Sequence, residues 1–297
     1  MDGLWNWDDL IHGTAVFSAA APLLVAGLLT ALLPLRWWWL AAILALAGPF
    51  LWFFGFPSIP LRSSEDAATA GLVAAAALTS LGATFRMRRP LRLSLSVALW
   101  TVLIWILYPA WLAAEGGLTR KVMVAGGLAA ATTVWAWVIE RLAYHVPVGE
   151  GRTHAGMTPA ALIPPAIALA VLLQLGGAMR FAQSIGAMAA ACAAVLVIWL
   201  WRKPPGEGLE WLAALWAMLF AQLAWCGWLF AEIRYGLAAL LCAAPLAGVL
   251  TRWLPLPRGT PLLRCFWEGL ASLLVSSIAA GIALAAYQQS ASGYEGY

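Results

Sequence analysis

The sequence predicts an all-α integral membrane protein in which about ten transmembrane helices form one bundle. Hydrophobic residues make up 63% of the 297 residues, and charged residues make up only 10%. A soluble domain has roughly 45–50% apolar and about 25% charged residues, because its surface must be hydrated. The apolar residues also gather in segments of about 20 residues, the length that a helix needs to cross a bilayer. Most of this chain is therefore expected to contact lipid.

The first five helices are expected where apolar segments alternate with short polar or basic connections. Arg36 marks the turn between the first two segments. Trp37, Trp38 and Trp39 follow it, and we expect them at the level of the lipid headgroups, because an indole ring is apolar while its N–H group needs a polar partner. The motif "SSED" at 63–66 is typical of a capping box that begins the third helix. The five segments are residues 14–34, 37–56, 67–85, 93–113 and 122–144.

Further tryptophans, among the 19 in the chain, are expected to anchor other helix ends at the membrane interface. These interfacial anchors are Trp199, Trp201 and Trp211. Four others fall deeper in the predicted helices, namely Trp100, Trp105, Trp135 and Trp216. We expect the deeper group to pack between helices, and the alternative is an aromatic wall around an apolar ligand.

The last five helices are expected between proline-rich connections and very short turns. "PPG" at 204–206 and the prolines around 255–261 break the chain, because proline and glycine interrupt helices. Arg180 and Arg234 lie in turns so short that eight or nine helices remain an alternative. The five segments are residues 160–179, 182–201, 209–230, 234–251 and 265–287.

The basic residues predict the orientation of the bundle, because cytoplasmic loops carry an excess of Lys and Arg. Most of the 17 Lys and Arg residues fall in one set of alternate connections. That set is Arg36, Arg86, Arg88, Arg89, Arg92, Arg141, Arg152, Arg202, Lys203, Arg252, Arg258 and Arg264. We therefore expect the N-terminus and the C-terminus on the outer, periplasmic side of what we take to be a bacterial inner membrane.

One polytopic membrane domain is expected over residues 1–297, with a short polar N-terminal segment at 1–13 and a polar C-terminal tail at 288–297. The N-terminal segment lacks the basic start of a secretory signal, so we expect it in the mature protein. A parallel repeat of four helices is a further hypothesis. It is based on the similarity of "AAPLLVAGLLTALLPL" at 20–35 to "AAPLAGVLTRWLPL" at 243–256.

No motif in the sequence indicates catalysis, a cofactor or a metal centre. P-loop, HExxH and GxSxG patterns are absent, and the four cysteines show no CxxC spacing. We expect those cysteines to be buried free thiols, and we expect Glu268 to pair with Arg264 one helical turn away. The sequence therefore predicts a protein that is not an enzyme, with no cofactor, no metal and no nucleic-acid partner.

A few polar residues in or near the apolar segments are candidates for a transport path or for hydrogen bonds between helices. The candidates are Gln174, Gln222, Glu140, His145 and Ser276. Prolines within helices are a second signal, because interrupted helices often line a transport site. Those prolines are Pro22, Pro49, Pro164, Pro165 and Pro245.

Two functions fit these observations. The first is an accessory or structural subunit of a larger membrane complex, whose partners are the lipid bilayer and other membrane protein subunits. The alternative is a transporter or flippase for a small neutral or lipidic molecule. A flat apolar flank with a bound partner would favour the subunit, whereas an aromatic pocket that opens to one side would favour transport.

Overall fold

The computed structural model describes most of the chain outside residues 1–14 and the connection after the first helix. The described ranges are 15–34, 63–85, 89–107, 110–143, 146–148, 152–154, 157–202, 209–231, 233–254 and 260–292, with residues 37, 40 and 44. The predicted segment 37–56 therefore lies largely outside the described residues. Every other predicted segment overlaps a helix.

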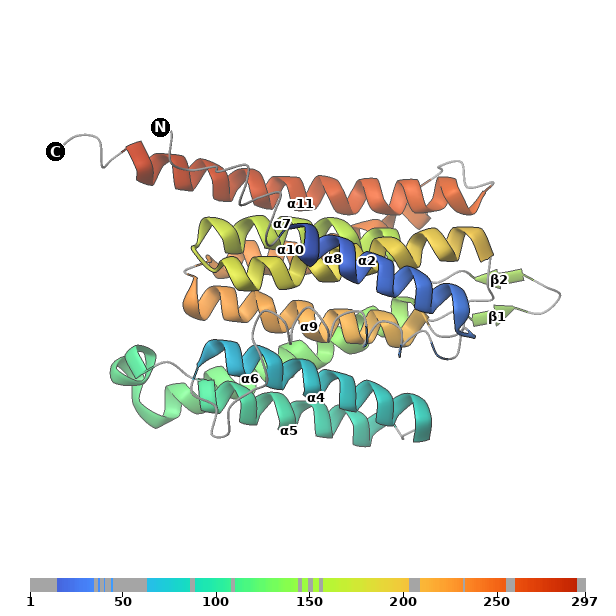
Figure 1. Ribbon diagram of the computed structural model, residues 1–297. Helices are drawn as coiled ribbons and strands as arrows, with labels where there is room; N and C mark the ends of the chain where they lie inside the picture. The colour runs from blue at the N-terminus through green and yellow to red at the C-terminus, as the bar shows by residue number, and fades with distance from the viewer. Residues whose placement is uncertain are drawn as a thin grey trace.

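The described helices lie side by side in one bundle (Figure 1). They are α2 (Ala15–Leu32), α4 (Ser64–Phe85), α5 (Arg89–Leu107), α6 (Ala110–Ala143), α7 (Ile163–Leu175), α8 (Met179–Arg202), α9 (Leu209–Phe230), α10 (Tyr235–Leu250) and α11 (Pro261–Ser292). Two short 3-10 helices, η2 (Pro159–Leu162) and η3 (Thr251–Trp253), precede α7 and follow α10.

Five of the described helices are long and apolar enough to cross a membrane. These apolar stretches are Gly117–Ala143, Met179–Trp201, Glu210–Phe230, Tyr235–Trp253 and Pro261–Gln289. Shorter apolar helices add Pro22–Leu32, Thr69–Leu81, Pro90–Ile106 and Pro159–Leu175. By the length and composition of its helices, the chain agrees with the predicted class, a helical integral membrane protein.

Helix α9 lies at the centre of the bundle. Residues 212–227 are all buried, as expected of a helix that is apolar on every side. Alanines such as Ala213, Ala217 and Ala224 keep its surface small, so neighbouring helices can approach closely. Helix α9 packs against α4 and α6 on one side and contacts α7, α8 and α10 on the other.

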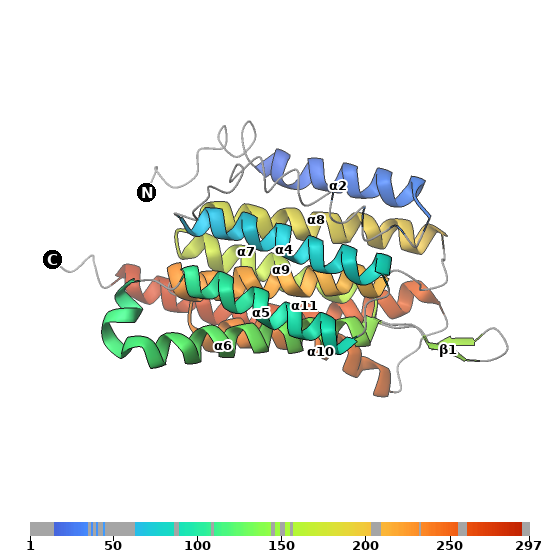
Figure 2. The same ribbon diagram turned by 90° about the horizontal axis from the view of Figure 1, so that it is seen from below.

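Two groups of helices meet at α9. Helix α5 packs between α4 and α6 in the first group. In the second group α7 packs on α8, α11 packs on α7 and α10, and α2 packs on α8. Figure 2 shows α2 on the outer side of α8, away from α5 and α6. Helix α9 is therefore the main connection between the two groups in the part of the chain that the structure describes.

A β-hairpin projects from one end of the bundle, where the sequence analysis placed a cytoplasmic loop (Figure 1). Strands β1 (Val146–Val148) and β2 (Arg152–His154) are antiparallel, with Val146 opposite His154 and Val148 opposite Arg152. We call this the hairpin end of the bundle and the other the far end. Helix α2 begins and α11 ends toward the far end.

Two predicted helix boundaries are corrected near the far end. Helix α5 ends at Leu107, whereas the predicted segment extends to residue 113. Pro109 explains the earlier end, because a proline disfavours helical geometry in the residue before it. Helix α6 begins earlier, at Ala110, and kinks at Gly117, whose φ of 59° suits glycine better than other residues. Trp105 therefore lies near the end of α5, where its ring faces the Lys121 ammonium at 4.4 Å.

The prolines divide into two kinds. Pro22 and Pro245 lie inside α2 and α10, as predicted. Pro164 and Pro165 lie instead in the first turn of α7, a position that proline tolerates because the amide of that turn has no partner within the helix. Pro164 and Pro165 therefore begin a helix rather than interrupt one. Pro49 lies outside the described residues.

The start of α4 has the hydrogen bonds that the capping-box sequence predicts. The Ser63 hydroxyl accepts a hydrogen bond from the Asp66 amide at 3.1 Å, and the Asp66 carboxylate accepts one from the Ser63 amide at 3.2 Å. This is the reciprocal pattern of a capping box. The predicted cap at 63–66 is confirmed.

Candidate functional site

The polar residues singled out in the sequence do not gather into one site. Gln174 is exposed in the last turn of α7, and Gln222 is buried on α9 against Gly71 of α4. Glu140 lies near the end of α6 at the hairpin end. Ser276 is buried on α11, where its hydroxyl donates to the Ser272 carbonyl at 2.8 Å. His145 lies outside the described residues.

Glu140 belongs to a charged cluster at the hairpin end. The Arg92 guanidinium of α5 donates to both Glu140 carboxylate oxygens, with an Nη2–Oε1 distance of 2.6 Å. The same guanidinium lies over the Trp211 ring of α9, 5.0 Å from its centroid. One helical turn deeper, Ser96 and Thr133 share a hydrogen bond of 3.0 Å between α5 and α6. This cluster joins α5, α6 and α9 through charges that are mostly removed from water.

A second charged cluster at the hairpin end surrounds Glu268 of α11. Only 1% of its side chain is exposed. Arg264 donates to Oε1 at 3.0 Å, which confirms the predicted pair, and Arg252 of η3 donates to the same oxygen at 3.3 Å. The other oxygen, Oε2, accepts the backbone amide of Thr158 at 2.7 Å. Glu268 therefore joins α11, η3 and the segment before η2.

The helices around Glu268 approach each other closely. A Cβ atom on Gly248 of α10 would lie 2.8 Å from the Glu268 carbonyl oxygen and 3.0 Å from the Ala161 Cβ atom. On the next turn of α11, the Ser272 hydroxyl donates to the Ala161 carbonyl at 2.8 Å. The hairpin end of this helix group is therefore held by close backbone contact as well as by charge.

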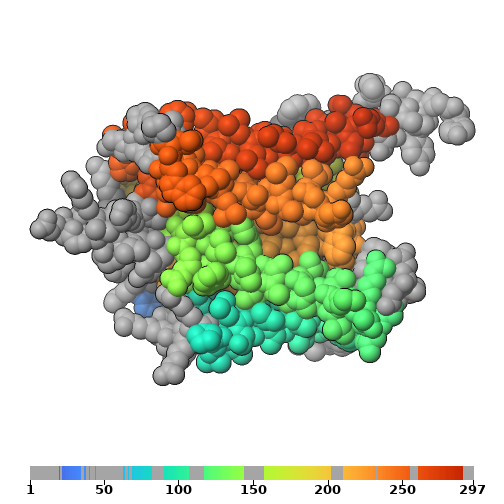
Figure 3. Space-filling model, turned by 180° about the vertical axis from the view of Figure 1, so that it is seen from behind, coloured from blue at the N-terminus to red at the C-terminus, as the bar shows by residue number. Residues whose placement is uncertain are grey.

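An apolar cavity of about 300 Å³, open to the surface of the bundle, lies in the far half of the bundle. Its lining comes from the middle of α6, from the part of α9 nearest Phe230 and from the first turns of α10. Three tryptophans and a tyrosine dominate this lining: Trp135, Trp225, Trp228 and Tyr235. We call it the aromatic cavity. Figure 3 shows α6 and α10 on the same face of the molecule.

A wider hollow adjoins the aromatic cavity at the far end. It has a volume of about 780 Å³ and is lined by residues of the connection from α9 to α10. Trp228 and Tyr235 line both spaces, and Arg234 lines the hollow. Tyr235 is 79% exposed. The aromatic cavity and this hollow therefore lie next to each other, with Trp228 and Tyr235 in both linings.

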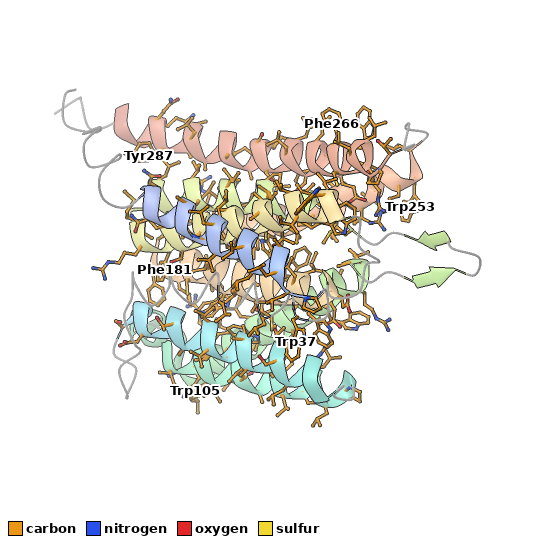
Figure 4. All side chains as sticks on the ribbon, turned by 45° about the vertical axis from the view of Figure 1, so that its right-hand side comes forward. Trp37, Trp105, Phe181, Trp253, Phe266 and Tyr287 are labelled. Carbon is orange, nitrogen blue, oxygen red and sulfur yellow. The ribbon has the colours of Figure 1, made fainter. Side chains whose placement is uncertain are left out.

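The predicted interfacial tryptophans have different environments. Trp37 and Trp201 are exposed, the latter by 74%. Trp211 is half-buried under Arg92, and Trp199 is buried within the bundle. Trp38 and Trp39 lie outside the described residues. Figure 4 shows other aromatic side chains toward both ends, with Trp253 and Phe266 toward the hairpin end and Phe181 and Tyr287 toward the far end.

Sequence reasoning missed the aromatic cavity, although an aromatic wall was the alternative for one of its residues, Trp135. Trp135 was expected to pack between helices, and an aromatic wall around an apolar ligand was the alternative. Its ring lines the cavity together with residues of α9 and α10. The signal that could have indicated the cavity is the spacing of Trp225 and Trp228, which places both rings on one face of α9.

The four cysteines are free thiols, as expected, and all except the half-buried Cys242 are buried. Among the described residues, no group of three or more His, Cys, Asp or Glu side chains is placed to hold a metal ion.

No protein family, curated protein or solved structure was found to match this chain.

Proposed function

We propose that the chain is a transporter or flippase that binds a lipidic or small neutral molecule and moves it across the membrane without covalent chemistry. The aromatic cavity supports this proposal. It is apolar and has the volume of a small ligand site, about 300–1,000 Å³. It also lies between α6 and α10, two helices that share α9 as a neighbour.

The difference between the two ends of the bundle also supports transport. The far half contains the aromatic cavity and the wider hollow, whereas two charged clusters join the helices at the hairpin end. A carrier exposes its site to one side of the membrane at a time. In this proposal the structure represents the state that is accessible from the far end, and the Glu268 and Glu140 clusters keep the hairpin end closed.

The orientation and the full helix count belong to the same proposal. The basic residues Arg92, Arg141, Arg252 and Arg264 lie near the hairpin end, so the positive-inside rule makes this end cytoplasmic. The N-terminus and the C-terminus would then be periplasmic, in a bacterial inner membrane. Ten transmembrane helices and the parallel four-helix repeat remain predictions.

An accessory subunit of a larger membrane complex is the second candidate. The observation that favours it is the outer face of α11, where large apolar side chains such as Phe266, Leu274 and Ile278 are exposed. Such a face suits another membrane subunit as well as lipid. Gentle detergent extraction, a blue-native gel and mass spectrometry of the band test this candidate, which predicts constant co-migration with the same larger proteins.

A lipid-movement assay in proteoliposomes tests the transport proposal. Fluorescent phosphatidylglycerol and phosphatidylcholine would be incorporated separately, and dithionite would quench the probe in the outer leaflet. We expect the protein to expose inner-leaflet probe to dithionite. The variant Ala239→Trp, which fills the aromatic cavity from α10, should slow this exposure strongly.

The matched control is Ala285→Trp, which adds the same side chain to the exposed face of α11. It should leave lipid movement unchanged. Equal rates in protein-containing and empty vesicles, or equal rates for the two variants, would contradict the proposal for these substrates.

A further inference from the structure

We infer that the aromatic cavity and the adjoining hollow together form a binding site for an anionic membrane lipid, with an acyl chain in the cavity and the headgroup at Arg234. This inference rests on the proposed function, because it names the class of molecule that the same site would take. It follows from three features: the adjacency of the two spaces, their depth, and the charge at the mouth.

The two spaces are adjacent because they share side chains. Trp228 of α9 and Tyr235 of α10 line both the apolar cavity and the wider hollow. In this inference one molecule extends from one space into the other past these two side chains. Because the cavity is almost wholly apolar and the hollow includes a charged side chain, the occupant must have an apolar part and a polar part.

The depth of the two spaces matches that of a membrane lipid. The hollow lies at the connection between Phe230 and Tyr235, where two helices of membrane-spanning length end. The cavity follows α10 inward from Tyr235 to Cys242, two helical turns into the hydrocarbon region. This is the arrangement of a headgroup and an acyl chain in a bilayer.

The charge at the mouth selects the headgroup. Arg234 is exposed, and among the described residues that line the hollow it is the one that carries a charge. A guanidinium binds phosphate oxygens well, because its planar donors match their geometry. An anionic lipid therefore complements the site better than a zwitterionic lipid, whose ammonium group would also lie near Arg234.

Arg234 also lines a third hollow, between α7 and α11, which includes Ala286 and Tyr287. A lipid on that side could reach the same guanidinium. We place the acyl chain in the aromatic cavity, because its lining is almost wholly apolar and includes aromatic rings from three helices, whereas the third hollow is lined by the Arg234 side chain itself.

Native mass spectrometry tests the site with the full chain in mild detergent, titrated with phosphatidylglycerol or phosphatidylcholine. We expect phosphatidylglycerol to bind about fivefold more tightly, since one basic residue near a membrane surface contributes about 1 kcal/mol. Arg234→Gln should remove this preference, and Arg234→Lys should retain most of it. Arg180→Gln, which removes another exposed arginine at the far end, should leave it unchanged.

Two further variants locate the acyl chain. Ala239→Trp in the aromatic cavity should weaken the binding of both lipids, whereas Ala286→Trp in the third hollow should not. The thermal unfolding of each variant in lipid-free detergent confirms that it is folded. A phosphatidylglycerol preference that survives Arg234→Gln overturns the inference, and so does binding that is lost in Ala286→Trp but not in Ala239→Trp.

The two proposals can fail separately. An Arg234-dependent preference without lipid movement in proteoliposomes would overturn transport and leave the lipid site standing. Movement of both lipids with no difference between Arg234→Gln and the natural protein would overturn the anionic site and leave transport standing.

Discussion

Glu268 shows how a buried charge in a membrane protein can be stabilised by partners from several elements. Its carboxylate receives two guanidinium groups and one backbone amide. The Arg264 partner could be predicted from the sequence, because residues four apart face each other on a helix. The amide of Thr158 could not, because it lies 110 residues away and reaches Glu268 only through the packing of η2 on α11.

Replacing Glu268 by Gln should destabilise the protein strongly. The change leaves Arg252 and Arg264 without their counter-charge, and removing one partner of a buried ion pair costs about 3–5 kcal/mol. Arg252→Gln should cost less, because 27% of the Arg252 side chain is exposed and Arg264 would remain paired. Thermal unfolding in detergent, compared with the surface change Gln174→Glu, checks this order. Equal melting temperatures for Glu268→Gln and the natural protein would contradict it.

The Arg92–Glu140 pair should behave as one unit. Arg92→Ala and Glu140→Ala each remove a hydrogen-bonded charge between α5 and α6. The double variant should therefore lose less stability than the sum of the two single variants, with a coupling of about 0.5–3 kcal/mol. A double-mutant cycle on the unfolding free energy measures this coupling. Full additivity would show that the pair contributes nothing to the packing of these helices.

At the scale of elements, helix positions could be predicted well where the signal is local. The predicted segment 209–230 coincides with α9, because the length of an apolar run is written directly in the sequence. The β-hairpin was missed, although "VPV" and "RTH" flank the glycine-containing sequence "GEG", which is a hairpin signal.

The contact between α10 and α11 depends on a small residue. Gly248→Ala should destabilise the protein by about 1–3 kcal/mol, because the new Cβ atom would press on the Glu268 carbonyl oxygen and on Ala161, and neither can move as freely as the end of a long side chain. Gly281→Ala on α11 is the control, since a Cβ atom there meets nothing within 4 Å. Thermal unfolding distinguishes the two, and a loss in Gly281→Ala equal to that in Gly248→Ala would refute the packing argument.

For the whole molecule, the membrane class followed from composition, but the site did not. The aromatic cavity is assembled from α6, α9 and α10, so its existence depends on which helices are neighbours. An apolar sequence gives little information on that choice, because Ala-rich and Leu-rich helices can pack in many pairings. Polar residues were the natural candidates, yet Gln174 lies on the surface and Glu140 takes part in an ion pair.

The proposed transport cycle requires the two ends of the bundle to move in opposite senses. When the Glu268 cluster breaks, the hairpin end should open and the far end should close around the aromatic cavity. Exposed residues on α6 and α10 report both movements: Val122 and Tyr235 lie toward the far end, and Arg141 and Leu250 lie toward the hairpin end.

The most direct test of the transport account is therefore to measure distances between pairs of spin labels by double electron–electron resonance, with the protein in lipid nanodiscs. The four natural cysteines would be replaced, and labels placed at residues 122 and 235 or at 141 and 250. The account predicts that Arg252→Gln, which weakens the Glu268 cluster at a smaller cost in stability than Glu268→Gln, lengthens the hairpin-end distance and shortens the far-end distance relative to the natural protein. If each labelled pair instead gives a single distance distribution that is the same in the variant and in the natural protein, the result would contradict transport and favour a static subunit.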